Sequence, residues 1–277
     1  PLNYSFLTRI NKIETKISYI YNYVLPVFIL FFYISNFNIH NNLIIFIFSF
    51  LALNIVYEIG YIYNDVYTIR YEKNPTLRLN DEESIVLNKI YPLMISLRIL
   101  IVIIIFIVLN NLNINTLNIF IFLIFLGLLN MVYSFHNYFR NNNNIITMFF
   151  LMFFKYLSVP ILVVDSINKI LILFIFLLTI PLVRTLLYTT HDRINFNFIK
   201  KDKINLFRVK FYGIEILLSL LIGTFSKKGY FLTFFSLYFF MFYLIALLIL
   251  EKKIKNRGEK KWNYYILYQW KLKNLMV

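Results

Sequence analysis

LIIFIFSFLALNIVYEIGYIYN, residues 43–64, is a run of 22 residues with one ionisable side chain, Glu58. A helix of about 20 apolar residues is long enough to cross the hydrocarbon core of a bilayer. The apolar residues surround the whole helix instead of forming one stripe, which suits contact with lipid and with other helices. The stretch therefore predicts a transmembrane helix that ends at the polar segment DVYTIRYE, residues 65–72.

Similar runs recur along the chain. The sequence is 60% hydrophobic and 15% charged, whereas soluble domains average about 45–50% and about 25%. We predict an all-α, polytopic transmembrane bundle that forms a single membrane domain over residues 1–277. About eight spans are expected, with nine as the alternative, over residues 20–36, 43–64, 90–110, 116–134, 145–164, 170–190, 209–226 and 230–250.

The basic residues predict the orientation of these spans. With the N-terminus in the cytoplasm, 22 Lys and Arg residues fall in cytoplasmic segments and three in outer loops, as the positive-inside rule requires. Both termini are thus expected in the cytoplasm, in a cell inner or plasma membrane. The tail 251–277 is basic and aromatic, which predicts an interfacial helix. The net charge of +15 is attributed to contact with anionic lipid and not with nucleic acid.

Several kinds of site are excluded by composition. The chain has no cysteine, which excludes disulfides, thiolate metal sites and cysteine nucleophiles. Its six glycines form neither a phosphate loop nor a dinucleotide fingerprint. His40, His136 and His191 lack the spacing of a zinc site.

Five charged residues lie well inside the predicted spans, where they are costly and usually functional. They are Glu58, Arg98, Lys155, Arg184 and Glu215. Four of them lie roughly 9–12 Å below the predicted cytoplasmic surface, and Lys155 is deeper. We predict a polar layer that lines a cavity open to the cytoplasm. In the alternative, the arginines extend to the interface and the acids simply pair with them.

Helical spacing places polar residues on two faces. Residues at intervals of three and four share one face of a helix, and a polar face toward lipid would be expensive. Both faces are therefore expected to line the cavity, together with Arg98 and Lys155. The first face holds Asn54, Glu58, Tyr61 and Asp65, and the second holds Arg184, Tyr188, His191 and Asp192.

Each polar face leads to an acidic motif at the predicted cytoplasmic surface. Asp65, Thr68 and Glu72 have helical spacing, and Mg²⁺ is usually held by one or two carboxylates together with phosphate oxygens of a substrate. Bases beside each acid could hold the remaining phosphate charge. These bases are Arg70, Lys73 and Arg78 in the first motif, and Arg193, Lys200 and Lys201 in the second.

The two motifs resemble the aspartate-rich motifs of UbiA-type intramembrane prenyltransferases. The family's first motif, Asn-Asp-x-x-Asp-x-x-x-Asp, follows its second helix. Asn64 and Asp65 match its first two positions, Thr68 replaces the second Asp, and Glu72 replaces the third.

The family's second motif is often Tyr-x-x-x-Asp-Arg-x-x-Asp. Here Tyr188, Asp192 and Arg193 match, and Phe196 replaces the last Asp. A third likeness is Tyr133-Ser134, and the layout is similar over roughly residues 20–250. The family usually has nine helices.

The resemblance implies a UbiA-like fold and a Mg²⁺-dependent enzyme that transfers a prenyl group from an isoprenyl diphosphate to an acceptor. It implies catalytic roles for Asp65, Asp192, Arg193 and Tyr188, and metal binding by Asp65, Glu72 and Asp192. It also implies diphosphate binding by Asn64, Arg70, Lys73, Arg78 and Lys200. Two alternatives remain open: a non-catalytic lipid-binding protein of the same fold, and an unrelated transporter whose polar layer is a permeation path.

Overall fold

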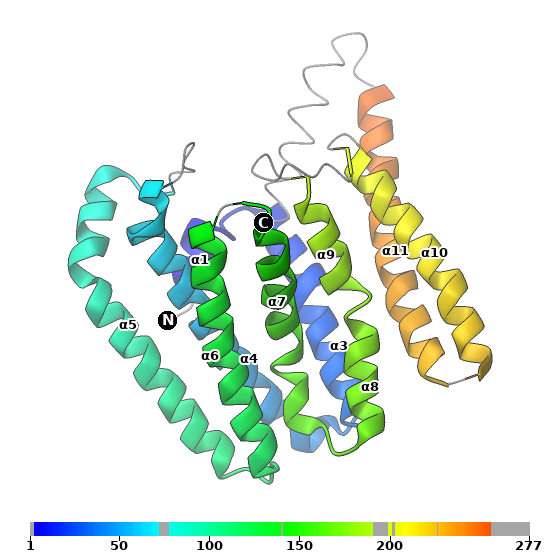
Figure 1. Ribbon diagram of the computed structural model, residues 1–277, viewed down its shortest axis with the longest axis horizontal. Helices are drawn as coiled ribbons and strands as arrows, with labels where there is room; N and C mark the ends of the chain where they lie inside the picture. Colours follow the sequence, from blue (N-terminus) through cyan, green and yellow to red (C-terminus); the bar gives the residue numbers. More distant parts are fainter. Residues whose placement is uncertain are drawn as a thin grey trace. The chain divides into compact units, whose positions relative to one another are not determined.

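The computed structural model describes residues 3–71, 78–139, 141–190, 199–200, 203–225 and 227–255. Within these ranges the chain is helical and contains no strand, which confirms the predicted all-α class (Figure 1). The helices group into two compact units, Pro1–Ile170 and Leu171–Val277, and each unit is described by itself.

The first unit contains a chain of helices joined by short turns. α2, a π-helical turn η1 and α3 follow one another directly, so that Ile13–Ile34 is one helix 22 residues long. The elements are α1 (Asn3–Thr8), α2 (Ile13–Tyr19), η1 (Ile20–Val24), α3 (Leu25–Ile34), α4 (Ile39–Val66), η2 (Thr68–Tyr71), α5 (Asp81–Asn110), α6 (Thr116–Phe139), α7 (Asn144–Leu157), η3 (Pro160–Val163) and the first residues of α8 (Ile167–Phe176).

The second unit consists of the end of α8, then α9 (Ile180–Tyr188), α10 (Ile204–Phe225) and α11 (Lys227–Lys255). α10 and α11 lie side by side as a hairpin (Figure 1). Their interface is built from aromatic rings, because Tyr212 of α10 stacks on Phe239 and Tyr243 of α11.

Six helices in the described ranges are long and apolar enough to cross a membrane, which identifies an integral membrane protein. They are Ile13–Ile34, Asn42–Val66, Asp81–Asn110, Thr116–Phe139, Ile167–Tyr188 and Gly229–Ile249. The two other predicted spans are also helical, but α7 has only 14 residues. α10 carries three charged residues, Arg208, Lys210 and Glu215, within its 22 residues.

α5 begins about nine residues earlier than predicted. Asn80 caps this helix: its side chain accepts from the Glu83 backbone N–H at 2.7 Å, and the Glu83 carboxylate accepts from the Asn80 N–H at 2.9 Å. This reciprocal capping box stabilises the polar first turns of the helix. The predicted span counted only the apolar residues and therefore missed them.

α4 and α6 approach each other closely at Gly60. A Cβ atom at this position would lie 2.7 Å from a ring carbon of Tyr133, which is too close for an unshifted structure. Tyr133 also makes edge contacts with Tyr57 and Tyr61 of α4. The glycine thus allows a tyrosine of α6 to pack against the polar face of α4.

Replacing Gly60 by alanine is expected to destabilise the protein by about 1–3 kcal/mol, since the tightly held Tyr133 ring must move. Gly127→Ala on the exposed face of α6 is the matched control, because a Cβ atom there meets nothing within 4 Å. The control should be neutral or slightly stabilising, by about 0.5–1 kcal/mol. Thermal unfolding in detergent measures both, and equal midpoints for the two variants would contradict the packing.

Candidate functional site

The predicted polar face of α4 exists and is covered by the N-terminal segment. The Tyr19 hydroxyl donates to Asn54 Oδ1 at 2.7 Å, and the Ser5 backbone N–H donates to Glu58 Oε1 at 2.7 Å. The guanidinium of Arg9 lies 3.9 Å from the ring centre of Tyr61. Residues of α1, of the turn after it and of α2 therefore contact the polar residues that recur along one face of α4.

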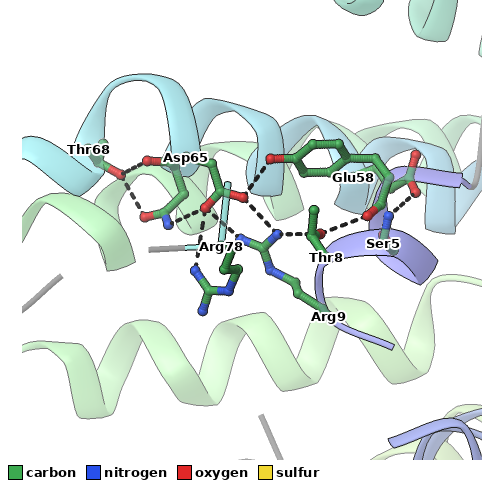
Figure 2. Close-up of polar contacts among 9 residues, drawn as sticks. Ser5, Thr8, Arg9, Glu58, Asp65, Thr68 and Arg78 are labelled. Atoms are coloured by element: carbon green, nitrogen blue, oxygen red, sulfur yellow. Dashed lines mark hydrogen bonds and ion pairs between the residues drawn. The ribbon is translucent and has the colours of Figure 1, made fainter. Parts of the chain in front are cut away.

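Asp65, at the end of this face, is the centre of a cationic cluster (Figure 2). Arg9 donates from Nη1 and Nη2 to the two carboxylate oxygens, each at 2.9 Å. The Tyr4 hydroxyl donates to Oδ2 at 2.6 Å, and Arg78 Nη1 lies 3.4 Å from Oδ1. Two guanidinium groups thus share one carboxylate, which leaves one positive charge in excess.

The neighbouring amide of Asn64 is held in one orientation. The Thr68 hydroxyl donates to Asn64 Oδ1 at 2.7 Å, so that the Asn64 amide nitrogen is directed toward Asp65 Oδ1, 3.2 Å away (Figure 2). All three side chains are buried. Thr68, which occupies a motif position where the resembled family has an aspartate, therefore orients a neighbour of Asp65 and adds no charge.

Glu58 and Arg98 form a buried ion pair between α4 and α5. Arg98 Nη2 lies 2.8 Å from Glu58 Oε2, and Glu58 is only 1% exposed. Arg98 also donates to the Met94 carbonyl oxygen at 3.2 Å. Glu58 and Arg98 therefore neutralise each other within the helix bundle.

Lys155 of α7 lies among aromatic rings. Its Nζ is 4.3 Å from the ring centre of Tyr23 and 4.6 Å from that of Tyr57. Tyr57 in turn contacts Tyr61 and Tyr133 edge to face. Because Tyr61 carries the Arg9 guanidinium on its face, aromatic contacts are continuous from the Asp65 cluster to Lys155.

The Tyr4 hydroxyl, which precedes the first span, acts as a donor. Burial and the adjacent charge of Asp65 raise the pKa of Tyr4 well above its ordinary value. The hydroxyl therefore keeps its proton at neutral pH and can donate to the Asp65 carboxylate.

The structure places the sequence-predicted residues as follows. It brings Asn64, Asp65 and Arg78 together, and it sets Asn54, Glu58 and Tyr61 along α4. Arg98 of α5 pairs with Glu58, and Lys155 lies against tyrosine rings. Glu72, Lys73, Asp192 and Arg193 lie outside the described residues, as does the side chain of Arg70 and the tail beyond residue 255. Arg184, Tyr188 and Lys200 belong to the second unit, so the expected meeting of the two motifs stays a prediction.

Two partners of Asp65, Tyr4 and Arg9, were not predicted from the sequence. Arg9 is one of the 22 basic residues that were assigned to the cytoplasmic side. A signal existed, because a base just before the first span is expected on the same membrane side as Asp65 at the end of the second. Nothing in the local sequence indicated that Tyr4 would join it.

Among the residues that the structure describes, no group of three or more His, Cys, Asp or Glu side chains is close enough to hold a metal ion. Comparisons with protein-family models, with curated proteins and with solved structures found no match.

The Glu58–Arg98 pair is expected to be strongly coupled. Arg98→Met leaves a buried carboxylate without its base and should cost about 3–5 kcal/mol. In the double variant Glu58→Gln/Arg98→Met no charge is left behind, so the combined cost should be smaller than the sum of the single costs by about 0.5–3 kcal/mol. Denaturant unfolding of the four proteins measures this coupling, and additive costs would show that the two side chains do not interact.

Proposed function

We propose that the chain is an intramembrane transferase that moves a prenyl group from an isoprenyl diphosphate to an acceptor. The observation that carries the proposal is the convergence of Arg9 and Arg78 on the single buried carboxylate of Asp65. Eight or nine spans, a UbiA-like arrangement and cytoplasmic termini belong to the same proposal, as does contact with the lipid bilayer.

The excess positive charge suits a diphosphate. Guanidinium groups bind phosphate oxygens through two parallel N–H bonds, with more specificity than a point charge. Arg78 is the more accessible of the two, with 24% of its side chain exposed, against 10% for Arg9. A diphosphate would approach from the Arg78 side and compete with Asp65 for the N–H donors.

The proposed chemistry needs a stabilised leaving group and a protected cation. The bond between the allylic carbon and the diphosphate oxygen breaks, pyrophosphate keeps the electron pair, and fixed positive charges stabilise it. The acceptor then attacks the allylic carbon and releases a proton. Aromatic faces stabilise such a cation, and Tyr57, Tyr61 and Tyr133 form the cluster next to Arg9.

The described residues do not by themselves fit a resident Mg²⁺ ion. They offer one carboxylate at the cluster, and both of its oxygens accept from arginine. Of the proposed ligands, Glu72 and Asp192 lie outside the described residues. Magnesium thus remains part of the proposal through those residues, and no step above depends on it.

A second candidate is a protein that binds the lipid diphosphate without transferring the prenyl group. The feature that favours it is Asp65 itself, whose oxygens are both engaged by arginine. Binding without release of pyrophosphate distinguishes this candidate from the transferase.

Purified protein supplied with prenyl diphosphates of several lengths, a panel of acceptors and Mg²⁺ should release pyrophosphate. Asp65→Asn is expected to lower the rate about 10²–10³-fold, because it alters the group that positions both arginines. Asp165→Asn is the control, since Asp165 is exposed and pairs only locally with Lys169. Equal release by Asp65→Asn and wild type would refute the transferase, and tight donor binding without any release would favour the non-catalytic candidate.

A further inference from the structure

The hairpin of α10 and α11 contains a buried acid that differs from Glu58 in its surroundings. Glu215 of α10 is 8% exposed, and neither of its carboxyl oxygens has a hydrogen-bond partner among the described residues. Glu58, by comparison, is buried but bonded to Arg98 and to the Ser5 N–H. An isolated ionised carboxylate in an apolar interior is far more costly than a neutral carboxylic acid.

The charged and titratable groups that face Glu215 do not neutralise it. Tyr212 lies one turn away on α10, and Tyr243 of α11 stacks on its ring. Arg208 lies seven residues from Glu215, about 10 Å along the helix, and its guanidinium is over the ring of Tyr243, 4.7 Å from the centre. The charge of Arg184 acts on Tyr212 and Arg208. Glu215 has no ion-pair partner among the described residues.

The hydroxyl nearest to Glu215 is engaged within its own helix. Ser236 of α11 lies next to the carboxyl. Its hydroxyl donates to the Leu232 carbonyl oxygen, with an O–O distance of 2.8 Å. Both carboxyl oxygens of Glu215 therefore remain without a hydrogen-bond partner among the described residues, which favours the neutral acid over the carboxylate.

We propose that Glu215 is a proton-binding site within the α10–α11 hairpin, where its buried and unpartnered carboxyl holds a proton at neutral pH. The site is distinct from the Asp65 cluster and does not rest on the proposed transferase activity. A carboxyl that is neutral while enclosed and ionised once it meets water would couple proton release to the separation of α10 from α11.

A hydrophobic carbodiimide tests the proposal, because it reacts with protonated carboxyl groups in apolar surroundings. The acid proton moves to one carbodiimide nitrogen while the carboxyl oxygen bonds to the central carbon. The O-acylisourea then rearranges to a stable N-acylurea, and no atom is lost. The full chain in detergent micelles is treated with dicyclohexylcarbodiimide at neutral pH, and mass spectrometry locates the adduct.

The expected adduct lies on Glu215 in the wild type, is lost in Glu215→Gln and is retained in Glu58→Gln. Glu58 itself should stay unlabelled, since it is ion-paired. Absence of the adduct at Glu215 at neutral pH, whether or not acid conditions produce it, would overturn the proposal.

Infrared spectroscopy gives a second readout that retains the acid. The wild type should show a carboxylic acid carbonyl band at neutral pH. The proposal would also be overturned if the wild type showed no carboxylic acid band at neutral pH, or if the band persisted in Glu215→Gln.

Discussion

The ion pair between Arg9 and Asp65 organises the first unit, because an ionised side chain at a helix end inside a bundle must find an opposite charge or a set of donors. It joins residues 56 positions apart and attaches α1 to the end of α4. The same docking brings the Tyr4 hydroxyl to Asp65 and the Ser5 N–H to Glu58. Without Arg9, Tyr4 would be left to donate to Asp65 from the N-terminal segment, and the carboxylate would lose its two shortest charged hydrogen bonds.

The same requirement is met in three different ways along the chain. Asp65 is surrounded by two arginines and a hydroxyl, and Glu58 is matched by one arginine. Lys155 lies against tyrosine rings. Glu215 has none of these partners among the described residues, and we propose that its carboxyl is neutral. The Asp65 cluster combines two guanidinium groups with one carboxylate, which is why it is the candidate site for an anionic ligand.

The sequence predicted what depends on local spacing. Apolar runs gave the helices, and the intervals of three and four placed Asn54, Glu58 and Asp65 on one face of α4. It could not predict partners distant in the chain, such as Tyr4 and Arg9 for Asp65. The sequence also predicted a similar depth for Glu58 and Glu215. It did not reveal that an arginine forms an ion pair with Glu58, whereas the Glu215 carboxyl has no hydrogen-bond partner among the described residues.

The proposed transfer chemistry requires that Arg9 and Arg78 bind a diphosphate. Calorimetric titration with an unreactive prenyl thiodiphosphate tests it without any need for turnover or a known acceptor. We expect binding by the wild type and about tenfold weaker binding for each of Arg9→Gln and Arg78→Gln, since each lost charged hydrogen bond is worth ~1.5 kcal/mol. Asp65→Asn should bind the analogue at least as well as the wild type, because it keeps both arginines and removes their competing carboxylate. Equal affinity of the wild type and both arginine variants would refute diphosphate binding by Arg9 and Arg78.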